Sequence, residues 1–196
     1  TLYVWAAGNH REYGQQGQKD GLTSSIYINT VSALNNKGTL SHYSETGAHI
    51  IVSAHSNGGT RGIYSTDLRG RNGYNQRGTA QGEPSGTSSA SPAVAGMMAL
   101  MLEANPNLNW RDVKEILLRS STKINPTSND WVTHPGGRPS LPAIKHHHFY
   151  GGGGGAAGEA VDLDVENVVG RIHVAGEAAE TRLHQRDELG RRRPQA

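Results

Sequence analysis

The sequence predicts an α/β fold that ends in a largely irregular C-terminal tail. Three observations predict it. Short apolar, β-prone segments recur within residues 1–68, two helix-like patterns follow within residues 92–120, and apolar residues become sparse beyond residue 125. We therefore expect residues 1–125 to be folded, residues 126–160 to form a glycine-rich connection, and residues 161–196 to form a charged, mobile tail.

Four strands are expected in the first part of the chain. Residues 2–7 are apolar and β-prone and end at a Gly-Asn pair, which predicts a buried strand followed by a loop. Residues 26–34, 49–54 and 62–68 have the same character and predict three more strands. Residues 69–87 are rich in Gly, Asn, Gln and Ser, so we expect a long loop there, of the kind that is usually functional or disordered.

Two helices are expected after that loop. Residues 92–104 are apolar almost all round, which is typical of a helix inside a core, and Pro92 suits a first helical turn. Asn109 has the side chain of an N-cap, and Asp112 adds a carboxylate to the first turn. The apolar stripe that follows, at positions 113, 116 and 117, predicts an amphipathic surface helix.

Composition excludes several classes of function. The formal net charge is +2 and the arginines are scattered, so no nucleic-acid-binding surface is predicted. There are no cysteines, which excludes disulfides and cysteine-based metal sites. No run of about 18 apolar residues exists, so we expect no transmembrane segment in this chain. The chain opens at Thr1 in strand-like sequence, and we expect its natural start to lie upstream.

The segment around Ser88 carries the clearest chemical signal. A long loop ends at Gly86, and the apolar helix begins a few residues later. A serine at a helix N-terminus lies near free backbone N–H groups and the positive end of the macrodipole, which favour negative charge. Ser88 is therefore a candidate nucleophile. The alternative is that Ser88 only caps the helix.

The string Gly-Thr-Ser-x-Ala-x-Pro that contains Ser88 resembles the nucleophile motif of the subtilisin family of serine proteases. A second string, Val-Trp-Ala-Ala-Gly-Asn ending at Asn9, resembles the segment that carries the oxyanion-hole asparagine of that family. The resemblance implies that Ser88 is the nucleophile and that Asn9 donates to the oxyanion. It also implies a partial subtilisin-like fold, a mostly parallel β-sheet flanked by helices, with residues 1–125 as the C-terminal part of the peptidase domain.

Further segments resemble the kexin/furin branch, the proprotein convertases. They include Asp-Gly-Leu-Thr-Ser-Ser-Ile-Tyr-Ile from Asp20, Tyr-Ser-Glu ending at Glu45, and the stretch from residue 102 to residue 112. The resemblance implies that Asp20 lies in the S1 pocket and selects arginine, with which a carboxylate pairs well. It implies a calcium site at Glu45. Another ligand position of that calcium site falls near Gln15, where the family usually has an aspartate. A turn carboxylate at Asp20 and a solvated one at Glu45 are the alternatives.

Two residues of the catalytic triad of the family, the aspartate and the histidine, are not identifiable in this sequence. The triad of the family runs Asp, His, Ser along the chain, and no segment here matches its Asp or His motifs. We expect both in a missing N-terminal part of the catalytic domain, and we expect this chain alone to be inactive as a fragment. The resemblance implies polypeptide substrates, cleavage after basic residues and a secretory or extracellular location. A broad-specificity subtilase, or a non-catalytic pseudo-protease or binding module, are the alternatives.

The C-terminal third departs from the family. The segment from Phe149 into the glycine run resembles, in degenerate form, the closure of a convertase domain, so we expect residues 126–160 to be such a closure and linker. The three consecutive histidines, residues 146–148, have the side chains of a metal site, although a polar loop or an added tract is the simpler account of them.

Overall fold

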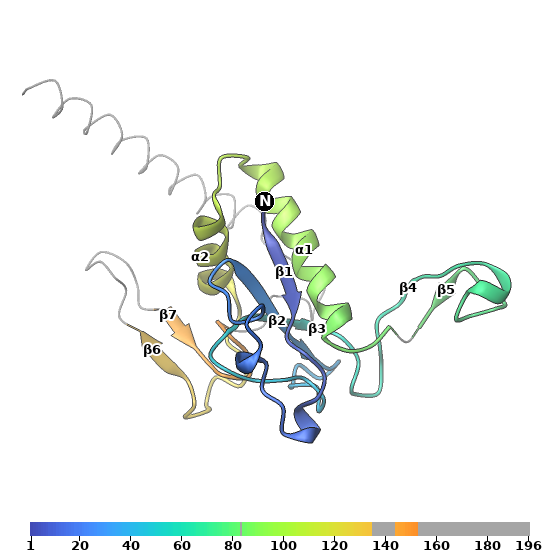
Figure 1. Ribbon diagram of the computed structural model, residues 1–196, viewed down its shortest axis with the longest axis horizontal. Coiled ribbons are helices and arrows are strands. Elements are labelled where there is room, and N and C mark those ends of the chain that lie inside the picture. Colours follow the sequence, from blue (N-terminus) through green and yellow to red (C-terminus); the bar gives the residue numbers. More distant parts are fainter. Residues whose placement is uncertain (83, 135–143, 153–196) are drawn as a thin grey trace, which may run out of the picture. The chain divides into compact units, whose positions relative to one another are not determined.

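A three-stranded parallel sheet organises the chain. The computed structural model describes residues 1–82, 84–134 and 144–152. Strands β1 (Tyr3–Ala6), β2 (Ile28–Leu34) and β3 (Ile50–His55) pair in that order, all in parallel (Figure 1). With the helices described below, this sheet confirms the expected mostly parallel α/β architecture.

The strands differ in how far they are buried. All seven residues of β2 are buried, because a neighbouring strand lies on each side and a helix covers one face. In β1 the exposure alternates, and Tyr3 and Trp5 are about half exposed. The expectation that residues 2–7 form a buried strand is therefore wrong for the described residues: β1 is an edge strand that buries one face.

Helix α1 (Thr87–Ala104) packs against all three strands (Figure 1). It begins at Thr87, five positions before the expected start, so Pro92 lies inside the helix instead of in its first turn. Only one stripe of α1 is buried, and Leu100 on another face is 53% exposed. The expectation of a helix enclosed in a core is therefore met on one face only. The buried stripe consists of Ala90, Val94, Met98 and Met101.

Helix α2 (Trp110–Ser120) begins where the sequence predicts. Asn109 Oδ1 accepts hydrogen bonds from the N–H groups of Arg111 and Asp112, and Asp112 Oδ2 accepts one from the N–H of Asn109. This reciprocal capping box satisfies backbone donors that the first turn leaves free. Val113 and Leu117 are buried in the core, as the amphipathic pattern predicts.

The remaining elements are short. The strand expected at residues 62–68 is reduced to β4 (Ser65–Thr66), which pairs antiparallel with β5 (Ala80–Gln81). The loops that the structure describes contain three 3₁₀ turns: η1 (Arg11–Tyr13), η2 (Gly17–Lys19) and η3 (Gly70–Asn72). Strands β6 (Val132–His134) and β7 (Ile144–His146) form an antiparallel pair. Among the described helices, none has the length and apolar character needed to cross a membrane.

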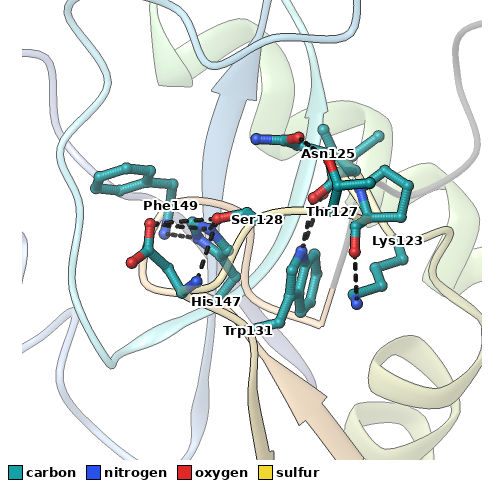
Figure 2. A network of polar contacts seen from close by, with 10 residues as sticks. Lys123, Asn125, Thr127, Ser128, Trp131, His147 and Phe149 are labelled. Carbon is teal, nitrogen blue, oxygen red and sulfur yellow. Dashed lines mark hydrogen bonds and ion pairs between the residues drawn. The ribbon is translucent and has the colours of Figure 1, made fainter.

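The described part of the C-terminal third is ordered around His147. Its ring is buried and lies 4.7 Å from the Tyr150 ring and 5.1 Å from the Trp131 ring, centroid to centroid. His147 Nδ1 accepts the N–H of Phe149, and Nε2 lies 3.2 Å from Ser128 Oγ (Figure 2). Residues 123–134 and 144–152 therefore form a packed segment and not an extended linker. The expected tail, residues 161–196, lies outside the described residues.

Candidate active site

The predicted nucleophile and oxyanion residue meet where the strands end. In a parallel sheet the carboxyl ends of the strands share one edge, the usual position of a site in α/β proteins. Strand β1 leads directly to Gly8 and Asn9, and β3 leads to Ser56 and Asn57. The N-terminus of α1 reaches the same edge, since residues 86 and 87 form hydrogen bonds with both strand ends.

Ser88 is the second residue of α1 and is exposed to solvent. Its N–H group belongs to the first helical turn, where backbone donors have no acceptor inside the helix. The side chain is thus accessible, and it lies at the end of α1 where partial positive charge accumulates.

Asn9 is held against the start of α1 by Thr87. Asn9 Oδ1 accepts hydrogen bonds from the Thr87 N–H at 2.8 Å and from the Thr87 hydroxyl at 2.9 Å. The Thr87 hydroxyl oxygen in turn accepts the N–H of Gly8 at 3.2 Å. Since the oxygen of the amide is engaged twice, its NH₂ group is the end left to donate. The amide nitrogen of Asn9 lies against Gly86, two residues before Ser88 in the chain.

The turn before Ser88 is fixed from the other side by β3. Ser56 Oγ donates to the Gly86 carbonyl at 2.7 Å, and Asn57 Oδ1 accepts the Gly86 N–H at 3.2 Å. Gly86 has φ of +80°, and a Cβ there would lie 2.7 Å from Asn9 Nδ2. The position therefore requires glycine both for its backbone and for the approach of Asn9.

Four residues of this arrangement were not predicted: Tyr43, Ser56, Asn57 and Thr87. Tyr43 OH donates to Asn57 Oδ1 at 2.7 Å, which fixes the amide that holds Gly86. Thr87 lies inside the nucleophile motif, so its position in that string was the available signal. The others form contacts between distant segments, which a local pattern does not reveal.

Asp20 lines an open pocket of about 580 Å³ beside this edge. Its Oδ1 accepts the N–H groups of Leu22 and Thr23 at 2.7 and 3.2 Å, so it also stabilises a turn. The turn role of Asp20 is therefore observed, and its role in an S1 pocket stays a prediction. Neither Ser88 nor Asn9 lines the pocket, but Gly8, adjacent to Asn9, does. The lining includes Gly8, His10, Gln15, Lys19, Asp20 and Glu45.

Glu45 is a buried carboxylate at this pocket. Its Oε1 accepts the N–H of His10 at 3.2 Å, and its own N–H donates to the Gly8 carbonyl at 3.0 Å. Calcium takes six to eight oxygen ligands, usually with several carboxylates. Within the described part of the chain, no group of three or more His, Asp or Glu side chains could hold a metal ion. The donors around Glu45, including the neutral amide of Gln15, do not fit a calcium site by themselves.

In the part of the chain that the structure describes, the base that a serine nucleophile needs is not in contact with Ser88. Among the described residues, no histidine forms a hydrogen bond with its side chain. The consecutive histidines are likewise not a metal site in this structure: His146 Nε2 bonds to the Ile50 carbonyl, and His147 is packed among aromatic rings.

Known proteins are similar to this chain in sequence and in fold. The sequence model of the subtilase family matches residues 1–142. Protease KEX1 of Kluyveromyces lactis is 40% identical over 131 residues, which are 67% of this chain and 16% of that protein. Furin of Bos taurus is 36% identical over 140 residues, which are 70% of this chain and 17% of that protein. The chain thus spans about a sixth of the length of these relatives.

The fold has solved counterparts. The serine protease of Aeromonas sobria superposes with a TM-score of 0.70 and 24% identity, covering 86% of this chain and 36% of that one. At that identity the likeness concerns the fold alone, and it agrees with the parallel sheet and its helices. The match of the family model over residues 1–142, with the identities to protease KEX1 and furin, shows that the chain belongs to the subtilase family, as a kexin/furin-like member.

Proposed function

We propose that this chain is the C-terminal part of the catalytic domain of a serine endopeptidase that cleaves polypeptides after basic residues, as in proprotein processing. One observation carries the proposal: Thr87 holds the oxygen of Asn9, and the amide nitrogen of Asn9 lies against Gly86, in the turn that leads into Ser88. Acyl transfer requires a nucleophile next to preorganised donors for the developing oxyanion, and the held amide of Asn9 supports that role.

In the proposed reaction, Ser88 Oγ attacks the carbonyl carbon of the scissile peptide bond. The carbonyl oxygen becomes an oxyanion and receives hydrogen bonds from Asn9 Nδ2 and the Ser88 N–H. The proton of Ser88 passes to a histidine base, which an aspartate orients, and then to the leaving amine. We propose that this histidine and aspartate belong to the N-terminal part of the domain, outside these 196 residues. Relatives that are matched over about a sixth of their length support this assignment.

The nucleophile is tested with a fluorophosphonate probe on the protein translated from the complete reading frame. We expect stoichiometric labelling of the parent protein and none of Ser88→Ala. The matched control is Ser91→Ala, a serine of the same helix that lies one turn further along. Labelling that persists in Ser88→Ala would refute the assignment. If the parent itself is unlabelled, the chain is a pseudo-protease, a reading favoured by the lack of a histidine at Ser88 among the described residues.

Specificity is proposed to reside in Asp20. Only one of its carboxylate oxygens forms hydrogen bonds with the turn, which leaves Oδ2 for a guanidinium. Peptides with arginine before the scissile bond should be cleaved fastest, and Asp20→Asn should remove that preference while keeping the turn bonds through the amide oxygen. Unchanged preference in Asp20→Asn would favour a broad-specificity subtilase.

Calcium stays a proposal attached to Glu45, and no step of the reaction depends on it. Support comes from a buried carboxylate at the pocket, which is a hard oxygen donor. Because the donors around Glu45 do not complete a site, the proposal requires further ligands from the rest of the protein. Calorimetric titration of the protein translated from the complete reading frame with CaCl₂ should then show binding that Glu45→Gln weakens. Residence in the secretory pathway or outside the cell is proposed from family resemblance alone.

A further inference from the structure

The imidazole of His49 lies between Gly17, which lines the Asp20 pocket, and Gly47, two residues after the pocket-lining Glu45, and the proposed reaction does not use it. His49 immediately precedes β3. A Cβ at Gly17 would lie 2.6 Å from His49 Nε2, and a Cβ at Gly47 would lie 2.7 Å from His49 Nδ1. With the ring in place, neither position has room for a side chain. The imidazole is therefore wedged between Gly17 and Gly47.

One side of this wedge supports Asp20. The Gly17 carbonyl accepts the N–H of Asp20 at 2.9 Å and the hydroxyl of Thr23 at 2.6 Å. These bonds fix the turn from which the Asp20 carboxylate enters the pocket. A displacement of Gly17 would therefore move Asp20, and Gly17 is packed against both the His49 ring and the Ala7 carbonyl.

The other side of the wedge is the segment that follows Glu45. Gln18 Oε1 accepts the N–H of Ala48 at 3.3 Å, which is a second link between η2 and this segment. The ring and this hydrogen bond together join the Asp20 turn to residues 47–48. The link is thus made by side chains, where the sequence has no cysteine to form a disulfide.

Both ring nitrogens of His49 are buried, and neither has a hydrogen-bond partner among the described residues. Buried polar groups normally have partners, so an unpartnered ring points to a further role. A neutral ring carries one N–H donor, whereas a protonated ring carries two and a full charge. Burial lowers the pKa of His49; the carboxylate of Asp20 opposes this shift, and His146 on β7 adds to it. The neutral form therefore predominates at neutral pH.

We propose that His49 is a positioning residue of the Asp20 pocket, which as a neutral ring holds the Asp20 turn against residues 47–48 and as a cation weakens the binding of a positively charged side chain. This rests on the proposed role of Asp20 in binding arginine. A protonated His49 near the pocket repels a guanidinium. It also attracts the Asp20 carboxylate, which the guanidinium would bind. Protonation of His49 and binding of a cationic ligand therefore oppose each other.

The test is the affinity for p-aminobenzamidine, a fluorescent aryl amidine, measured from pH 7.5 to 5.5 on the protein translated from the complete reading frame. We expect the affinity of the parent to fall about three- to tenfold over this range. His49→Gln should bind as the parent does at pH 7.5 and show a flatter profile. His49→Ser, which leaves the space of the ring empty, should bind more weakly at every pH. His42→Gln, a change at an exposed histidine outside the pocket, should keep the parent profile.

A profile of His49→Gln as steep as that of the parent would overturn the proposal. If His49→Ser does not fold, the NMR titration of the His49 ring in the parent decides: the probe should shift its midpoint to lower pH, and an unshifted midpoint would also overturn it. Asp20→Asn separates the two levels. Unchanged probe affinity in Asp20→Asn would refute the arginine pocket itself. If Asp20→Asn loses affinity but His49→Gln has the same pH profile as the parent, only the role of His49 is refuted.

Discussion

Asn9 owes its orientation to one neighbour, Thr87. Two donors from Thr87 bind Asn9 Oδ1, so the amide cannot turn its oxygen toward the oxyanion without losing both bonds. We predict that Asn9→Ala lowers kcat about 10²- to 10³-fold with little change in KM, a magnitude measured in subtilisin, another subtilase. Peptide hydrolysis by the protein from the complete reading frame checks this.

Asn107→Ala, a change at an exposed asparagine between the two helices, is the matched control and should leave kcat unaltered. A fall in kcat of less than about threefold in Asn9→Ala would show that its amide does not stabilise the transition state. The sequence predicted Asn9 and Ser88 as a pair. The contact between Thr87 and Asn9 was not predicted, because the motif resemblance assigned no role to Thr87 and no local pattern joins residues 78 positions apart.

At the scale of elements, α2 and α1 show where local pattern suffices and where it does not. The start of α2 is encoded within four residues, Asn109 to Asp112, and the structure has the capping box there. The start of α1 was misplaced at Pro92, because its first turn depends on distant partners: Asn9 accepts the N–H of Thr87, and Ser56 binds the Gly86 carbonyl. Tertiary contacts thus extend the helix to include Ser88.

The capping box of α2 gives a stability prediction. Asn109→Ala removes the acceptor of the Arg111 and Asp112 N–H groups and should lower the free energy of unfolding by about 1 kcal/mol. Urea unfolding followed by circular dichroism measures it. Asn109→Ser retains a capping oxygen and should cost only a few tenths of that. Equal losses in the two variants would mean that capping is not the cause.

At the scale of the whole molecule, α1 contains more apolar side chains than the described residues bury. The sequence predicted an enclosed helix, yet one stripe packs on the sheet and Leu100 remains 53% exposed. The sequence pattern could not predict which face of the helix would be buried, because residues 92–104 are apolar almost all round. The proposed N-terminal part of the domain would account for the composition of the exposed face and for the open edge at β1.

Acid should destabilise the molecule as a whole through three histidines. Burial is the largest cause that lowers the pKa of His49, His146 and His147 below the ordinary value of 6.5. The unfolded chain therefore binds more protons than the folded chain as the pH falls below about 6.5. Linkage then requires the free energy of unfolding to be greatest above that pH and to decline as the pH falls toward the lowered folded-state values.

His147 is the one to vary, because its ring is fully buried and its Nδ1 accepts a hydrogen bond only while unprotonated. His147→Phe should be less stable than the parent at pH 7.5, by about 1–3 kcal/mol for the lost bonds of Ser128 and Phe149. Its stability should nevertheless decline less between pH 7 and pH 5, since one titrating group is gone. Urea unfolding at several pH values measures both effects, with His42→Gln as the exposed control. Parallel pH profiles for the parent and His147→Phe would exclude His147 as a source of acid sensitivity and leave it to His49 and His146.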